Sequence, residues 1–179
     1  MSQWQYFQRC TSLSAFQNLL EIARQENNKT DWKEQSVAWL RDNLEEKESY
    51  NRYYSSHSPR ADTLIEIYML DKTWGKAWQV VEGFRVSDHL HLQLARESGK
   101  NSLNDYWSHI FPAFKKLAIN EIEQGNNKAY NNAVSILVEL LQLVVGTPYL
   151  QEAKGGIAEL TETYKRKRNF VSYLNAAVK

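Results

Sequence analysis

The chain has little of what disulfide-linked, zinc-binding or strand-rich proteins need. Its 179 residues include a single cysteine, Cys10, which excludes an internal disulfide and a zinc site built on several cysteines. A lone cysteine fits a reducing compartment. Only 7 glycines and 3 prolines are present, fewer turn-forming residues than an all-β fold usually has. These shortages together favour helices.

Excess charge and long apolar runs are also lacking. The formal net charge is +1 and the isoelectric point is near 7.8, whereas nucleic-acid-binding domains often exceed roughly 9. The longest apolar run, SILVELLQLVV at 135–145, is interrupted by Glu139 and Gln142 and is too short to cross a bilayer. The first ten residues lack the apolar core of a signal peptide. We therefore expect a cytoplasmic protein that does not associate with membranes.

Apolar residues, by contrast, recur at helical spacing from end to end. Leu13, Phe16 and Leu20 follow one another at steps of three and four, which is typical of a buried helix face. Ser58 followed by Pro59 is a helix start signal, a cap residue and then proline at the first helical position. The same patterns predict helices over 12–26, 31–47, 60–72, 73–84, 87–100, 101–127, 128–146 and 149–179.

Two of these helices contain residues that interrupt a helix. Pro112 predicts a kink or a break within 101–127. Gly155 and Gly156 mark the point at which 149–179 would divide, if it forms two helices and not one. With short connections throughout and no convincing strand, the sequence predicts an all-α protein.

Paired helices joined by short connections are how α-solenoids are built. We predict antiparallel helical hairpins stacked as a short, TPR-like α-solenoid, in which TPR stands for tetratricopeptide repeat, although no exact repeat period is visible. The expected organisation is a single domain over 1–179, with a flexible N-terminal tail over 1–11.

Four basic residues in a row stand near the end of the chain, in YKRKRNFVSYL at 164–174. Because residues on a helix advance by about 100° each, these four side chains cannot form one stripe. Apolar residues at steps of three, four and seven continue through the run, and Lys167 falls on their face. We expect its stem to lie along the core and its ammonium to reach solvent. A solvated helix is favoured over an anion or nucleic-acid contact through Lys165, Arg166, Lys167 and Arg168.

Several segments together carry a family resemblance: RADTLIEIYMLDKTWGKAW (60–78), LARESGK (94–100), NNKAYNNAVSILVEL (126–140) and YKRKRNFVSYLNAA (164–177). They resemble the C-terminal helical region of bacterial SWIM zinc-finger family proteins, in pattern more than in identity. The zinc module of that family needs a Cys-x-Cys pair followed by Cys-x-His, and this chain has one cysteine. The resemblance therefore implies a helical-repeat region for protein interaction, without zinc binding or the nucleic-acid role attached to the zinc module.

No set of residues predicts catalysis or a bound metal. His89 and His91 are two residues apart, so on a helix they point about 200° apart and cannot easily share a metal. Asp105 and His109 have the spacing of a hydrogen-bonded pair on a helix, but no nucleophile stands at a convincing position. A glycine-rich phosphate loop is absent. We predict a chain that is not an enzyme and has no catalytic, cofactor-binding or metal-binding residues.

A tyrosine-rich polar connection over 49–59 is the predicted partner-binding segment. It contains Tyr50, Arg52, Tyr53 and Tyr54. Tyrosine and arginine are the residues that often anchor protein interfaces. Packing on neighbouring helices is the alternative for these side chains. The predicted function is a non-catalytic helical-repeat module that binds another protein, and the alternative is a nucleic-acid-associated accessory domain. Self-association stays open.

Overall fold

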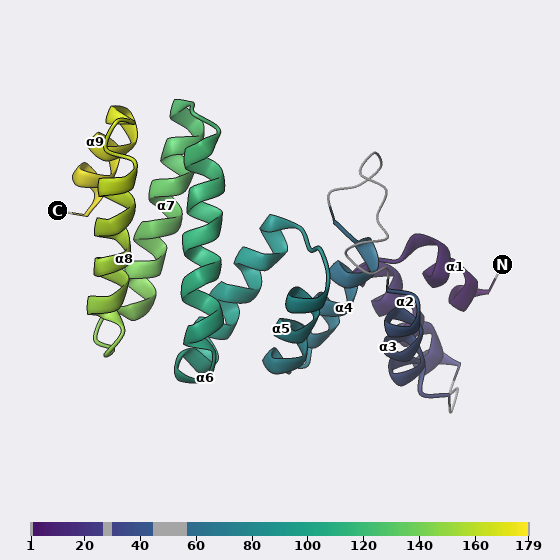
Figure 1. Cartoon of the computed structure of the whole chain (residues 1–179). Coiled ribbons are helices and arrows are strands. Elements are labelled where there is room, and N and C mark those ends of the chain that lie inside the picture. Colours follow the sequence, from purple (N-terminus) through teal and green to yellow (C-terminus); the bar gives the residue numbers. More distant parts are fainter. Residues whose placement is uncertain (1, 27–29, 45–56, 179) are drawn as a thin grey trace. The chain divides into compact units, whose positions relative to one another are not determined.

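Helices make up all the regular structure that is described. The computed structural model describes residues 2–26, 30–44 and 57–178, and no strand occurs within these ranges (Figure 1). This confirms the all-α prediction for the described chain. The helices are α1 (Gln3–Cys10), α2 (Leu13–Gln25), α3 (Trp32–Asp42), α4 (Pro59–Leu70), α5 (Trp74–Gly83), α6 (Asp88–Glu123), α7 (Asn127–Val144), α8 (Leu150–Thr163) and α9 (Arg168–Ala177).

The chain groups into two compact units, Met1–Leu94 and Ala95–Lys179. Helix α6 begins in the first unit and continues in the second. The expectation of a single domain stays a prediction. No helix of the described chain is long and apolar enough to cross a membrane.

The N-terminal segment, which we expected to be a flexible tail, contains helix α1. The Ser2 hydroxyl accepts a hydrogen bond from the Gln5 backbone N–H, and the Gln5 side chain accepts one from the Ser2 N–H. This capping box satisfies two amides that a helix start leaves unpaired. Phe7 is fully buried, and its ring lies 6.2 Å from Phe16 and 5.8 Å from Trp39, measured between centroids. Capping and burial of Phe7 together hold this segment against α2 and α3.

Local capping signals position the other helices of the first unit. The side chains of Ser12, Asp31 and Ser58 each accept a hydrogen bond from the backbone N–H three residues on. The start predicted from Ser58 and Pro59 is confirmed. Successive helices pack on one another from α1 to α5. The core side chains of this unit include Leu40, Leu64, Ile65, Ile67, Ala77 and Trp78.

Helix α6 departs from helical geometry at Ser102, where φ is −152° and ψ is 48°. Pro112 lies inside α6 and the dihedral angles there stay helical, so the break into two helices that it allowed does not occur at that residue. Pro112 and Ser108, whose carbonyl loses its partner to the proline, are both exposed, so water can satisfy that carbonyl. Gly99 lies inside the helix. A Cβ at Gly99 would come 2.5 Å from the Leu143 side chain, so the glycine lets α7 approach closely.

In the second unit, helices α6 and α8 run in the same direction (Figure 1). Trp107 of α6 hydrogen-bonds Glu152 of α8, and Lys115 pairs with Glu159, at separations of 45 and 44 residues. Helix α7 runs antiparallel to α6, since Arg96 pairs with Glu139 near one end. Near the other end Asn132 donates to Glu121. Helix α9 starts beside the start of α7, where the side chains of Asn127 and Asn169 hydrogen-bond.

The last two helices divide at a different place from the one expected. Gly155 and Gly156 both lie inside α8, and the break comes at residues 164–167. The Phe111 ring packs over Gly156, where a Cβ would lie 2.5 Å from the ring. These glycines therefore do not end a helix, and Gly156 provides clearance for a side chain of α6.

Candidate partner-binding surface

The residues predicted to anchor a partner, Tyr50, Arg52, Tyr53 and Tyr54, lie outside the described residues. Their role stays a prediction. The candidate surface is therefore built from the described helices alone.

The basic run lies at a turn and not along one helix, which corrects the sequence-based interpretation. Helix α8 ends at Thr163 and α9 begins at Arg168, so Lys165, Arg166 and Lys167 fall between helices. The argument from the 100° helical step does not apply to them. Their directions follow from the turn and its contacts.

Lys167 points its charge inward, against the expectation that it reaches solvent. Its Nζ donates a hydrogen bond to the carbonyl of Ile122 at 3.0 Å, in the last turn of α6. The same nitrogen lies 6.0 Å from the ring centroid of Tyr130, 5.9 Å from that of Tyr164 and 3.8 Å from a Glu123 oxygen. Helix ends leave carbonyls without intrahelical partners, and aromatic faces attract cations. Lys167 therefore joins the α8–α9 turn to the end of α6.

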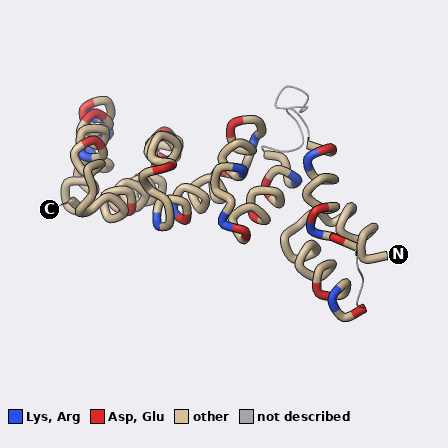
Figure 2. The backbone as a smooth tube through the Cα atoms, turned by 90° about the horizontal axis from the view of Figure 1, so that it is seen from below, with Lys and Arg blue, Asp and Glu red and all other residues tan. Residues whose placement is uncertain are grey.

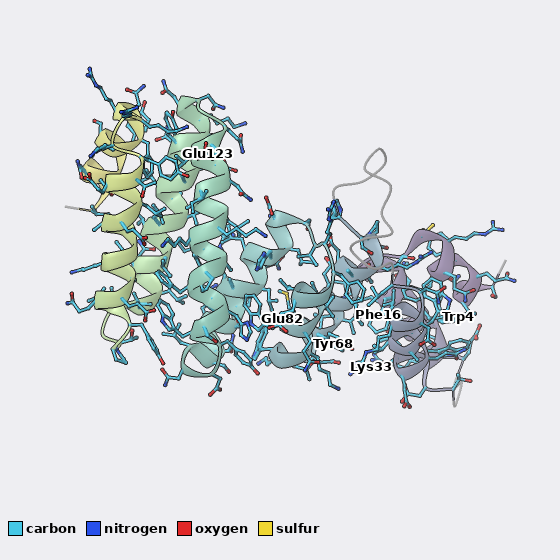
Figure 3. The ribbon with its side chains drawn as sticks, viewed as in Figure 1. Trp4, Phe16, Lys33, Tyr68, Glu82 and Glu123 are labelled. Carbon is cyan, nitrogen blue, oxygen red and sulfur yellow. The ribbon has the colours of Figure 1, made fainter. Side chains whose placement is uncertain are left out.

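Tyr164 strengthens the same junction. A hydrogen bond to the Glu123 carboxylate raises the pKa of the Tyr164 hydroxyl, and burial and the charge of Glu123 add to the rise. Glu123 is labelled in Figure 3, at the end of α6. We call Glu123, Tyr130, Tyr164 and Lys167 the turn clasp; its contacts hold helix ends together.

Only part of the basic run remains for an external contact. Lys165 pairs with Glu162 one turn earlier on the exposed surface. Arg166 and Arg168 are exposed, and their side chains make no ion pair or hydrogen bond within the described chain. Basic and acidic residues are interspersed along the helices of both units in Figure 2. Two free guanidiniums are fewer than the phosphate contacts on which nucleic-acid affinity usually depends.

A hollow with tryptophan walls lies among α1, α2 and α3. Its volume is ≈ 440 Å³. Trp4 and Trp32 are half-buried, with ring centroids 5.6 Å apart, and the floor includes the buried Leu19. Trp4 is labelled in Figure 3. The remaining lining residues are Ser2, Gln3, Ile22, Ala23 and Glu26. We call this the tryptophan hollow. The sequence interpretation missed it because it assigned Trp4 to a tail, although Trp4 and Phe7 already had helical spacing.

A second hollow, of ≈ 350 Å³, lies between α3 and the α4–α5 turn. Tyr68 is 4% exposed, and its hydroxyl is buried with no hydrogen-bond partner of standard geometry. Figure 3 labels Tyr68 and Lys33, which both line it. The full lining is Asp31, Lys33, Glu34, Val37, Tyr68, Asp71, Thr73 and Lys76. We call this the tyrosine hollow.

Burial raises the pKa of Tyr68. The Arg41 guanidinium lies 6.0 Å from the ring centroid and opposes this rise through its charge and a weak hydrogen bond, while the charge of Asp71 adds to it. The net shift is upward, so the hydroxyl keeps its proton at neutral pH and can donate a hydrogen bond.

The other residues weighed for chemistry are not brought together. His89 is exposed, whereas His91 is buried with its ring 5.7 Å from that of Trp78. Asp105 is exposed, and the ring of His109 lies 6.4 Å from that of Tyr106. Within the described ranges, no group of three or more histidine, cysteine, aspartate or glutamate side chains could hold a metal ion.

Comparison with known proteins gave no match to a family model, to a curated protein or to a solved structure. The resemblance to the helical region of SWIM zinc-finger family proteins therefore stays a prediction.

Proposed function

We propose that this chain is a non-catalytic helical-repeat module that binds another protein. Helix α7 runs antiparallel to α6, and α8 and α9 both pack on α7; we propose that these helices form part of a short, TPR-like α-solenoid.

The observation that carries the proposal is the regular spacing of contacts between α6 and α8. Trp107 meets Glu152, and two turns further on Lys115 meets Glu159, at separations of 45 and 44 residues. The α7–α9 contact between Asn127 and Asn169 spans 42 residues. Two contacts between one pair of parallel helices share an offset in any fold, but a similar offset for the pair α7 and α9 supports a stacked helical repeat. Stacked helical repeats create extended surfaces, and those surfaces commonly bind other proteins.

The tryptophan hollow supports binding at the first unit. It exposes part of two indole rings beside aliphatic side chains, with Glu26 at its rim. Tryptophan is among the residues that most often dominate binding energy at protein interfaces, especially beside a pocket. The apolar part of a partner side chain would fill this hollow and displace its water.

The proposal is tested by photo-crosslinking with the full chain in extract of the cells that produce it. A photoreactive residue at Ile22 lies in the tryptophan hollow, and the same residue at Lys154, exposed on α8, is the matched control. We expect one protein adduct from position 22 that saturates, resists nuclease and is absent with Trp32→Ala.

Two outcomes would overturn the proposal. One is the absence of a saturable protein adduct at position 22. The other is capture of nucleic acid through the basic run, with affinity that falls steeply as salt rises, which would support the accessory-domain alternative.

A further inference from the structure

The tryptophan hollow carries a negative charge that the described chain does not neutralise. Glu26 is the one ionisable side chain among the described residues that line it, and no lysine, arginine or histidine is among them. The Glu26 carboxylate is exposed and makes no ion pair with a described residue. Arg24, two residues earlier on the chain, pairs with Glu21 at 3.4 Å and does not line the hollow. The charge of the lining therefore favours a cation.

The end of α2 acts in the same sense as Glu26. Ile22 and Ala23, which line the hollow, belong to the last turn of α2, and Glu26 is its C-cap. A helix C-terminus carries a partial negative charge, which stabilises a cation placed beside it. An acidic side chain would be repelled at this end of the hollow. A wholly apolar side chain would displace water from the Glu26 carboxylate without replacing its hydrogen bonds.

Two indole rings complete the lining. Trp4, labelled in Figure 3, and Trp32 are half-buried, with ring centroids 5.6 Å apart. The Trp4 N–H donates to the Gln8 amide oxygen at 3.2 Å, and its ring makes an edge contact with Trp39 at 6.1 Å between centroids. Because its N–H is already used within the first unit, Trp4 offers the hollow an aromatic surface and not a donor. Aromatic faces attract cations, and tryptophan does so most strongly.

From these three features we infer that the tryptophan hollow binds a lysine or arginine side chain of the partner protein. The methylene groups of this side chain pack on Leu19 and Ile22, while its charged group lies against the indole rings and toward Glu26. Long basic side chains combine an apolar stem with a charged end in this way. A hollow of ≈ 440 Å³ is large enough for a small ligand, so a whole side chain fits. This inference rests on the proposed function and adds the chemistry of the partner.

The test uses the full chain and three small probes, the N-acetyl methylamides of lysine, arginine and norleucine. Norleucine keeps the apolar stem of lysine and lacks the ammonium. The indole N–H signals of Trp4 and Trp32 in NMR spectra, assigned by single substitution, report on the hollow. We expect the lysine and arginine probes to shift both signals saturably. The norleucine probe should bind about fivefold more weakly, because it loses the attraction to the indoles and to Glu26.

Glu26→Gln keeps the size of the side chain at the rim and removes its charge. This variant should bind the lysine probe about threefold more weakly, the usual effect of one exposed charge pair. It should bind the norleucine probe as the wild type does. Glu34→Gln is the matched control, since it removes the same charge from an exposed position of the first unit that does not line this hollow. It should leave the affinity for the lysine probe unchanged.

Three results would overturn the inference. Norleucine binding as tight as lysine binding would assign the hollow to an apolar side chain. An equal effect of Glu26→Gln and Glu34→Gln on the lysine probe would show that Glu26 does not recognise the charge. The third is the absence of a saturable shift with all three probes.

These outcomes are distinguishable from those of the proposed function. If the partner crosslinks at position 22 with the same half-saturation in Glu26→Gln as without it, the partner does not place a cation in the hollow, while the interaction module stands. If nothing crosslinks at position 22, the proposed function fails even where the lysine probe binds.

Discussion

Lys167 shows how one side chain can serve a junction between helices. Lys167→Met keeps the stem but removes the hydrogen bond to the Ile122 carbonyl and the contacts with the Tyr130 and Tyr164 rings. We expect the free energy of unfolding to fall by about 1–3 kcal/mol. Lys165→Met, two residues away on the exposed surface, should change it by less than about 0.5 kcal/mol. Urea unfolding followed by circular dichroism measures both, and equal effects would show that the clasp contributes nothing specific.

Glu66 provides a pH-dependent test at the residue scale. Burial on α4 raises the pKa of its carboxyl group, and the nearby charge of Asp62 raises it further. The folded protein then holds this proton more tightly than the unfolded chain does, so stability is full below the ordinary carboxyl pKa and falls as pH rises through the raised value. Glu66→Gln should therefore raise the thermal midpoint at neutral pH.

The advantage of Glu66→Gln should disappear below about pH 4, where the wild-type carboxyl is protonated in both states. Glu34→Gln, on the exposed start of α3, should give no gain at either pH, because a carboxylate there is favoured by the helix dipole. Differential scanning calorimetry across pH would make the comparison. A gain from Glu66→Gln that is as large in acid as at neutral pH would exclude ionisation as its cause.

The sequence analysis placed Lys167 on the apolar face of one helix, whereas it lies in the turn between α8 and α9 and its charge reaches the end of α6. Periodicity reports which face of a helix is buried, because that information is local. The Ile122 carbonyl and the Tyr130 ring are 45 and 37 residues away along the chain, and no local pattern specifies that they meet Lys167. The tyrosine hollow was missed for the same reason, because Lys33, Tyr68 and Lys76 come from three helices.

At the scale of the helix, two adjacent glycines of α8 should respond in opposite directions to the same substitution. A Cβ at Gly155 meets nothing within 4 Å, so Gly155→Ala should stabilise the protein by about 0.5–1 kcal/mol through helix propensity. A Cβ at Gly156 would lie 2.5 Å from the Phe111 ring. Phe111 is stacked on Trp107 with ring centroids 5.1 Å apart, so the Phe111 ring cannot move freely. Gly156→Ala should therefore lower the free energy of unfolding by about 1–3 kcal/mol.

Chemical denaturation of the two alanine variants checks this contrast. Phe111→Leu combined with Gly156→Ala should recover part of the loss, because the shorter side chain no longer reaches the new methyl group. Stabilisation by alanine at both glycines would mean that α6 and α8 do not approach as closely as described.

The helix start at Ser58 and Pro59 was predicted from its capping signal, whereas the start of α1 at Ser2 and the helix interruptions were not. The starts after Ser12, Asp31 and Ser58 follow from side chains that accept hydrogen bonds three residues on, which is a local signal. Gly156 was expected to mark a division between helices. Its absent side chain instead leaves room for Phe111, as that of Gly99 leaves room for Leu143, and both of these side chains belong to other helices. A glycine that serves packing cannot be told from a glycine that serves a turn by its immediate neighbours.

At the scale of the whole molecule, the repeat proposal predicts that damage stays local. In a stacked array each hairpin is stabilised by its neighbours, so stability is a sum of repeat and nearest-neighbour terms. Phe170 on α9 and Phe7 on α1 are both fully buried, which makes them a matched pair in the second and first units. Replacing either by alanine removes a buried ring and should lower the free energy of unfolding of the surrounding helices by about 3–5 kcal/mol.

Hydrogen exchange of the full-length variants, resolved by peptide, would show which helices lose stability. Phe170→Ala should speed exchange in α7, α8 and α9, because its ring lies near those of Tyr130 and Tyr164. Exchange in α1–α3 should keep its wild-type rate. Phe7→Ala should give the converse pattern, since the Phe7 ring contacts Phe16 and Trp39. Uniform acceleration along the described chain in both variants would indicate one cooperative unit. The stacked-repeat part of the proposed function would then be wrong, because an array of nearest-neighbour contacts does not transmit the loss of one ring from end to end.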